Sequence, residues 1–315
     1  MAQSLSKLEL ARFDPAILGS KKKSKTKKRA FSDASDCNSD HDNSSNDDNA
    51  AGDSNSEFEI EVRFQGGLTT NQQDAFATAA ARWSEIIVGD LQAVRLPTGE
   101  VVDDVLIDAS GTRIDGPGRV LGRAAPTLIR QNKLPAAGFM EFDVDDLRRM
   151  ESDGTLVDVI IHEMGHVLGV GTLWGELDLV TTNCLQAANP VFFGLNAANE
   201  LGAILGVEQP IAVPVENQHG PGTRCGHWRE TIFGHEGMTG FVNQGPNPIS
   251  RMTVGALEDM GYEVNYDAAD SYSLPSQLSL MMMGIGDDRS NQRCCSCAGA
   301  ERKTQPVLLP EEMHL

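Results

Sequence analysis

Alternating apolar and charged side chains mark the first strand of the chain. Residues 58–64 read FEIEVRF, an unbroken alternation that is typical of a half-buried β-strand. Two glycines, Gly66 and Gly67, follow and end it. Shorter apolar runs predict further strands over 101–107 and 138–142. Ordered structure is therefore expected to begin near the first of these strands.

Helical periodicity follows the first strand. Thr70 and Gln73 have the spacing of a capping box, and apolar residues then recur at helical intervals, which predicts a helix over 71–87. Near the other end of the periodic region, Ser250 stands where an N-cap belongs and a glycine follows the last turn of a predicted helix over 251–260.

The most apolar helix is predicted over 156–168. Thr155 and Asp158 have capping-box spacing at its start, and Gly169 stands where a glycine commonly ends a helix. The apolar run contains His162, Glu163 and His166 near its middle, which would be costly in lipid, so we expect no transmembrane helix here.

Composition places an ordinary globular domain between two irregular ends. The chain has 315 residues, a net charge of −19 and one dense basic run at 21–29. This acidity argues against a nucleic-acid partner, and the basic run is either a nuclear-localisation or anionic-surface patch or, more simply, part of a solvated tail. Residues 1–56 are predicted to be a disordered N-terminal extension, because 32–56 is almost devoid of apolar side chains. Residues 266–315 are predicted to be a weakly ordered tail.

The location of the protein and its redox state stay open. The first 20 residues carry several charges and have no apolar core of a signal peptide, so the sequence predicts a cytoplasmic protein or export by a non-standard route. Six cysteines are too few for a disulfide scaffold.

The segment His162-Glu163-Met164-Gly165-His166 is the most informative part of the sequence. On a helix the two histidines share one face about one turn apart, so both rings can reach one ion, while Glu163 lies beside it. That placement suits a general base for a metal-activated water. Coincidence is the alternative, but two histidines on an apolar helix need polar partners, and one zinc ion serves both.

A third ligand must come from further along the chain. The metzincin pattern places a third histidine three residues after the glycine, but Thr172 occupies that position. His219, His227 and His235 are then the available candidates.

The motifs that follow the helix resemble those of leishmanolysin-type metzincins, particularly their short bacterial-type relatives. In chain order they are Gly169, the insert 170–226, the pair His227-Trp228, the pair Gly237-Met238 and the run ALEDMGY at 256–262. The resemblance covers about residues 57–265. It departs at Gly237, where relatives usually carry a larger apolar residue, and at His235.

The resemblance implies a zinc endopeptidase. It implies that His162, His166 and His227 hold one Zn²⁺, that Glu163 is the general base, and that Met238 forms a Met-turn beneath the metal. His227 also fits from its neighbours, because bulky Trp228 follows it, whereas His219 lies in a turn-rich run and His235 lies too close to the Met-turn.

The implied fold class is α+β. An N-terminal subdomain (57–169), with a twisted mixed sheet and the active-site helix, lies above a mostly irregular C-terminal subdomain (170–265), and the cleft runs between them. Residues 121–125 resemble the upper rim of the cleft, an edge strand that pairs with an extended polypeptide substrate. Residues 142–146 resemble a calcium-bearing segment, although a solvated acidic strand end is the simpler interpretation.

Several alternatives stay open. Cys184 and Cys225 either form a disulfide that ties the insert to the zinc-ligand segment or remain two thiols. A catalytically silent zinc-containing adhesion or binding module is the alternative function, and Glu163 argues against it. A latent enzyme, with Cys37 of the extension capping the zinc, is a weaker alternative because no matching motif surrounds that cysteine. The cluster at 294–297 receives no role.

Overall fold

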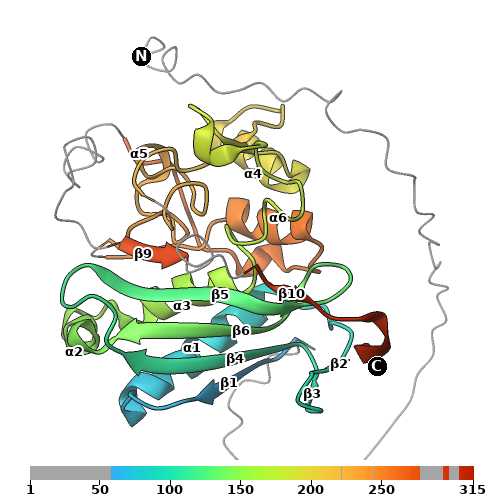
Figure 1. Ribbon diagram of the computed structural model, residues 1–315. Helices are drawn as coiled ribbons and strands as arrows, with labels where there is room; N and C mark the ends of the chain where they lie inside the picture. Colours follow the sequence, from blue (N-terminus) through green and yellow to red (C-terminus); the bar gives the residue numbers. More distant parts are fainter. Residues whose placement is uncertain (1–57, 221, 244, 277–293, 298–304) are drawn as a thin grey trace, which may run out of the picture. The chain divides into compact units, whose positions relative to one another are not determined.

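A six-stranded mixed sheet organises the computed structural model, which describes residues 58–220, 222–243, 245–276, 294–297 and 305–315 (Figure 1). Its strands are β1 (Ile60–Phe64), β4 (Val105–Thr112), β5 (Val120–Ile129), β6 (Pro135–Asp143), β9 (Cys294–Cys297) and β10 (Val307–Leu308). They lie in the order β1-β4-β6-β5-β10, and β9 also pairs with β5. The β5–β6 pair is antiparallel and the other pairs are parallel, so the expectation of a mixed sheet is confirmed.

A buried carboxylate breaks the strand expected over 101–107. The first part, β3 (Val101–Val102), pairs antiparallel with β2 (Val94–Arg95), and β4 begins only after Asp104. The Asp104 carboxylate is buried and accepts two backbone N–H groups, each at 2.7 Å. Because these bonds hold Asp104 between the two strands, the continuous strand predicted from apolar content is wrong.

Three helices accompany the strands of this sheet in the N-terminal part of the chain. They are α1 (Thr70–Ile86), α2 (Val144–Asp153) and α3 (Leu156–Val167). Helices α1 and α3 lie side by side on one face of the sheet (Figure 1), where the Trp83 Nε1–H donates to the Ile161 carbonyl at 3.0 Å. Within the described residues, no helix combines the length and apolarity needed to cross a lipid bilayer.

The capping box of α1 lies one residue earlier than predicted. Thr69, not Thr70, is the N-cap; its side chain accepts from the Gln72 N–H, and the Gln72 side chain accepts from the Thr69 N–H. The sequence contains two overlapping Thr-x-x-Gln pairs, and spacing alone does not choose between them.

The capping box predicted for α3 is wrong, although the helix itself begins at the expected residue. Thr155 has φ −98° and ψ −2°, already close to helical values, and its side chain makes no capping bond. An N-cap side chain usually reaches the first turn from an extended backbone. Asp158 instead accepts a hydrogen bond from the Asn247 side chain at 2.9 Å, which ties the start of α3 to a distant loop.

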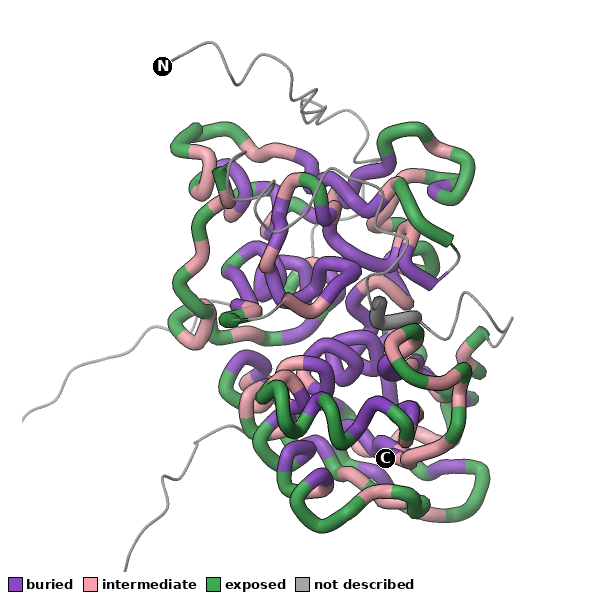
Figure 2. Tube along the Cα trace, turned by 90° about the vertical axis from the view of Figure 1, so that its left-hand side faces the viewer, coloured by how far each residue is buried: buried purple, intermediate pink, exposed green. Residues whose placement is uncertain are grey.

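Residues 170–276 are mostly irregular chain with short elements. These elements are η3 (Cys184–Gln186), β7 (Val191–Phe192), α4 (Leu195–Leu205), β8 (Val213–Pro214), α5 (Glu230–Phe233), α6 (Arg251–Met260) and η4 (Tyr266–Ala268). The prediction of α6 with Ser250 as its N-cap is confirmed. Asp259 of α6 accepts two backbone N–H groups from the first turn of α4. One buried apolar cluster includes residues of α1, α3, α4 and α6. Figure 2 shows buried segments in both the upper and the lower half of the view.

Part of the tail predicted over 266–315 has regular structure. Strand β10 is followed by the buried Leu309, whose N–H donates to the Ile129 carbonyl at 2.8 Å, and by η5 (Glu311–Met313). The Leu315 N–H donates to the Ala93 carbonyl at 2.9 Å. A two-residue strand is too short to show a periodic pattern in the sequence. Its conformation comes from pairing with β5. The N-terminal extension, with its basic run and Cys37, lies outside the described residues.

In the acidic segment 142–146, Asp145 is exposed, whereas the other two carboxylates lie inside the fold. Asp143 and Asp146 are both buried. Asp143 Oδ2 accepts the backbone N–H groups of three consecutive residues, 114–116, and Oδ1 accepts that of Asp145; Asp146 accepts that of Gly118. These two carboxylates therefore hold the loop between β4 and β5, and calcium binding here stays a prediction. Burial raises the pKa of Asp143, but these backbone donors outweigh burial and leave the pKa below its usual value.

Asp143→Asn should lower the free energy of unfolding by about 2 kcal/mol at neutral pH, because hydrogen bonds to a charged acceptor are lost. A carboxylate whose pKa is depressed by folding stabilises the fold above its unfolded pKa of about 3.9, and this stabilisation is lost as the pH falls through the folded value. Urea unfolding at several pH values should therefore show the two proteins converging in acid. A difference that does not change with pH would contradict the assignment of charge to Asp143.

Candidate metal centre

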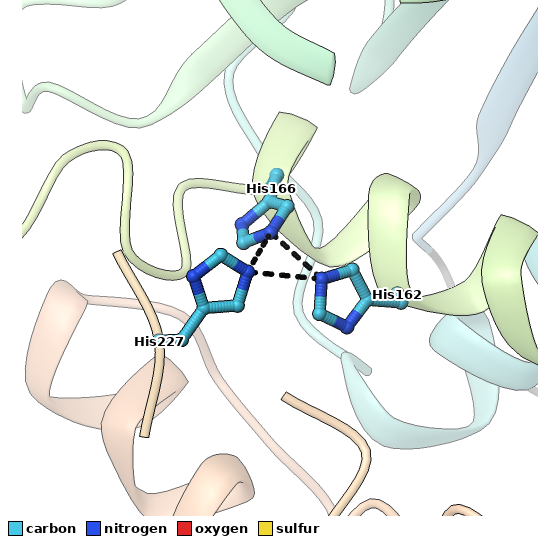
Figure 3. A group of neighbouring side chains, drawn as sticks. All are labelled: His162, His166 and His227. Atoms are coloured by element: carbon cyan, nitrogen blue, oxygen red, sulfur yellow. Dashed lines mark hydrogen bonds between the residues drawn. The ribbon is translucent and has the colours of Figure 1, made fainter. Parts of the chain in front are cut away.

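Three buried histidines converge on one point. His162 and His166 lie one turn apart on α3, and His227 comes from the chain that follows the insert (Figure 3). The three Nε2 atoms lie 3.0–3.1 Å from one another. Three nitrogens at about 2.0–2.1 Å from a tetrahedral zinc ion would lie about 3.3–3.4 Å apart, close to this arrangement.

The outer nitrogens fix the tautomer of each ring. The Nδ1 of His162 lies 2.8 Å from the Gly237 carbonyl, that of His166 lies 2.8 Å from the Val170 carbonyl, and that of His227 lies 2.9 Å from the Thr223 carbonyl. A carbonyl oxygen only accepts, so each Nδ1 carries the hydrogen and each neutral ring turns a lone pair toward the other two.

Such a group of lone pairs fits a metal ion. Burial lowers the pKa of His162 to about 4 and that of His227 to about 3, and burial also holds the pKa of His166 well below its usual value. All three rings are therefore neutral near pH 7. Lone pairs that face one another repel, and a cation at their centre removes that repulsion. The donor set of three imidazoles is one that zinc commonly takes.

A sharp turn after α3 sets the orientation of His166. Gly169 has φ 103°, and a Cβ there would lie 2.5 Å from Met260 Cε, so glycine is required. The turn returns the Val170 carbonyl to His166 Nδ1, while Thr172 Oγ1 donates to the His166 carbonyl at 2.7 Å. The prediction that Gly169 turns the chain is confirmed, and Thr172, where a third histidine might have stood, instead closes this turn.

A second glycine holds the acceptor for His162. Gly237 donates its N–H to the Pro248 carbonyl at 2.8 Å, and its own carbonyl accepts from His162. A Cβ at Gly237 would lie 2.7 Å from Ile249 Cδ1 and 3.0 Å from the Asn247 carbonyl oxygen. The lack of room explains the glycine at this position.

Met238 packs against the helix between the two histidines. Its side chain is fully buried, and a Cβ built on Gly165 would lie 2.9 Å from the Met238 sulfur. Only a glycine on α3 allows this close approach. Met238 thus lies against the helical turn that carries His162 and His166.

Backbone bonds on both sides fix the segment of His227. The Glu216 N–H donates to the His227 carbonyl at 2.9 Å, and the Trp228 N–H donates to the Met238 carbonyl at 3.0 Å. Two residues before His227, Cys225 forms a disulfide with Cys184. This pairing answers the question that the sequence left open, and it ties the insert to the third histidine.

Trp228 anchors the same segment in the core. Its side chain is fully buried, its ring centroid lies 4.5 Å from that of Trp174 and 5.5 Å from that of Phe192, and its Nε1–H donates to Thr253 Oγ1 at 2.8 Å. Trp228 therefore links His227 both to the insert and to α6.

Sequence analysis missed Glu236, which connects the loop of Met238 to α6. Its fully buried carboxylate accepts from the Met238 N–H at 2.7 Å, from the Ser250 Oγ–H at 2.7 Å and N–H at 3.1 Å, and from Thr253 Oγ1. Burial raises the pKa of Glu236, and these donors counter the rise. Glu236 lies in no periodic segment, but a lone acidic residue just before the Gly-Met pair was a signal that the sequence offered.

Glu163 is fully buried beside β5. A Cβ built on Gly122 of that strand would lie 3.2 Å from Glu163 Cγ, so the glycine makes room for the carboxylate. Glu163 directly follows His162 on α3, which places it on the side of the helix that faces the β5 strand.

The other two histidines lie elsewhere. The His219 ring packs edge-on against Phe241 at 4.9 Å, and the His235 ring lies 5.5 Å from that of Tyr272. In the part of the chain that the structure describes, one other group has ligand atoms close enough for an ion, namely Asp90, Asp103 and Asp104. It is largely exposed, and the buried member already accepts two backbone N–H groups.

Comparison with known proteins gives a family. The leishmanolysin family model matches residues 102–281, over half of the 315 residues. Proteins named leishmanolysin-like peptidase from Caenorhabditis elegans and Caenorhabditis briggsae are each 42% identical over 66 residues, which is 20% of this chain and 10% of the relative. One from Drosophila pseudoobscura pseudoobscura is 42% identical over 60 residues, 19% of this chain and 9% of the relative. The match thus spans about a tenth of these relatives' length. The family match, together with the buried histidine triad, shows that the chain belongs to the leishmanolysin family of zinc metallopeptidases.

Proposed function

We propose that this chain is a zinc-dependent endopeptidase that cleaves polypeptides. The observation that carries the proposal is the convergence of three neutral imidazole lone pairs on one point, on the same helix turn as a buried glutamate. Membership of the leishmanolysin family supports this proposal, because that family consists of zinc metallopeptidases.

Each residue of the centre has a distinct role in the proposed reaction. His162, His166 and His227 hold the zinc ion, and their Nδ1–H bonds to backbone carbonyls keep the rings in place. When bound, the ion supplies Lewis acidity that activates a water and polarises the scissile carbonyl. Glu163 accepts the proton of the water and returns it to the leaving amine. Met238, packed against Gly165, forms the apolar base below the ligands.

The detailed architecture belongs to the same proposal. The fold is of the metzincin type, with an N-terminal subdomain over 57–169, a C-terminal subdomain over 170–265 and the substrate cleft between them. An extended substrate pairs with β5 near Gly122, beside Glu163. Neither the family match nor the geometry of the centre favours the adhesion-module alternative.

Glu163→Gln should retain zinc and lose peptidase activity. The amide keeps the shape of the side chain but cannot accept a proton, and a general base contributes about 10²–10⁴-fold to a rate. Zinc content and casein cleavage, measured on the same preparations, test this. Glu61→Gln, at an exposed strand position, is the matched control and should behave as the parent. A Glu163→Gln variant that cleaves casein at the parental rate would refute the proposed mechanism.

Alanine substitutions at the three candidate histidines should separate ligand from bystander. His227→Ala should lose most of the bound zinc, because it leaves two protein ligands instead of three. The His219→Ala and His235→Ala variants should still bind one zinc ion per chain, since the replaced rings pack on Phe241 and Tyr272 and not at the centre. Zinc is measured by atomic spectroscopy after dialysis against a weak chelator. Full zinc in the His227 variant, with loss in either of the others, would overturn the assignment.

A further inference from the structure

The outer edge of β5 carries a segment of the same chain. On one side β5 pairs with β6, and on the other it pairs in parallel with β9 and β10. The register places Val120 opposite Cys294 and Ala124 opposite Cys297, and further along it places Leu128 opposite Val307. Figure 1 shows β9 alongside β5. Residues 294–297 and 307–308 thus lie along the edge that an extended peptide would need.

This edge borders the metal centre. Gly122, which packs against Glu163, lies between the two β5 residues that pair with Cys294 and Ser296. Cα atoms of β9 also come within 8 Å of Cα atoms of α3, the helix that carries the metal ligands. The position of β9 along the edge is therefore the position nearest the catalytic glutamate.

The same C-terminal segment lines a cavity further along β5. The cavity has a volume of about 410 Å³ and is lined by Ala125 and Pro126 of β5 and by Gly226, the neighbour of His227. Gln305 and Pro306 form another part of its wall. Both the edge beside the metal centre and the adjoining cavity thus have the C-terminal segment as a neighbour.

We propose that β9 is an internal competitor of substrate, which occupies the β5 edge until a peptide displaces it. An open strand edge offers one row of backbone donors and acceptors, so it pairs with a single added strand at a time. The inference rests on the proposed function in that the competing ligand is a peptide substrate. The partner of this surface is therefore an extended polypeptide, supplied either by the chain itself or by the substrate.

The two ends of the segment are held unequally. Beyond β10, Leu309 is buried and its N–H and carbonyl bond to Ile129 and Gln131, while the Leu315 N–H bonds to Ala93. Strand β9 has four residues, and its register with β5 is irregular between Val120 and Arg123. The anchored end keeps β9 at a high effective concentration beside the edge, and its short, irregular pairing makes β9 the part that yields.

Ser296→Pro in the full-length chain tests the inference, with Ser296→Thr as the matched control. Proline removes a backbone N–H and disfavours the strand, whereas threonine keeps the N–H and favours it. The probe is a fluorescein-labelled synthetic peptide with the sequence of residues 292–299 in which serine replaces each cysteine, so that no reductant is needed and the Cys184–Cys225 disulfide stays intact. Its affinity is measured by anisotropy in the Glu163→Gln background, where no cleavage interferes. Cys297→Pro, at the other end of β9, provides a second disruption should Ser296→Pro fold poorly.

The proline variants should bind the probe about tenfold more tightly than the parent or the threonine variant, because the tethered competitor no longer occupies the edge. With Glu163 intact and zinc bound, they should also cleave casein about tenfold faster, and the unlabelled peptide should inhibit them. Equal affinities in all variants would overturn the inference, even where the parent cleaves casein and the proposed function stands. Tighter probe binding without casein cleavage by any zinc-loaded protein would support the inference and refute the proposed function.

Discussion

The repulsion among three imidazole lone pairs is the constraint around which the rest of the structure is arranged. Each Nδ1–H is committed to a backbone carbonyl, so none of the three rings can turn to donate toward the others. Folding without a cation leaves this repulsion buried, and burial makes it stronger because water is excluded. A cation held between the rings would convert the repulsion into attraction. The free energy of metal binding is then coupled to the free energy of folding.

The carbonyls that orient the rings come from three separate turns. Two of them lie four residues from their histidine, whereas Gly237 lies 75 residues from His162. Local sequence can therefore orient His166 and His227, but His162 depends on the packing of a distant loop. Glu236 holds that loop on the N-terminus of α6 through Ser250 and Thr253. The buried carboxylate thus links α6 to the orientation of the His162 ring.

The parts of the structure that sequence predicted are those with local signals. The helix of His162 and His166, the turn at Gly169 and the N-cap Ser250 each depend on spacing within a few residues, and the structure contains all three. The break in the strand at Asp104 and the burial of Asp143 depend on backbone N–H groups far away in sequence. No periodicity reports such partners. The prediction of a weakly ordered tail missed β9 and β10 for the same reason, since short strands take their conformation from the strand with which they pair.

An unpaired strand edge at a peptide-binding site presents a physical conflict. Exposed edges invite pairing with other chains and aggregation, and proteins commonly cover, charge or shorten them. A peptidase that binds extended substrates by strand addition needs the same edge to be accessible. A short tethered strand satisfies both demands, because it covers the edge in the absence of substrate and contributes few hydrogen bonds that a peptide must replace. Firm anchoring through Leu309 and weak pairing through β9 are the combination that this compromise requires. A longer, more regular β9 would protect the edge better but would exclude substrate from the site it covers.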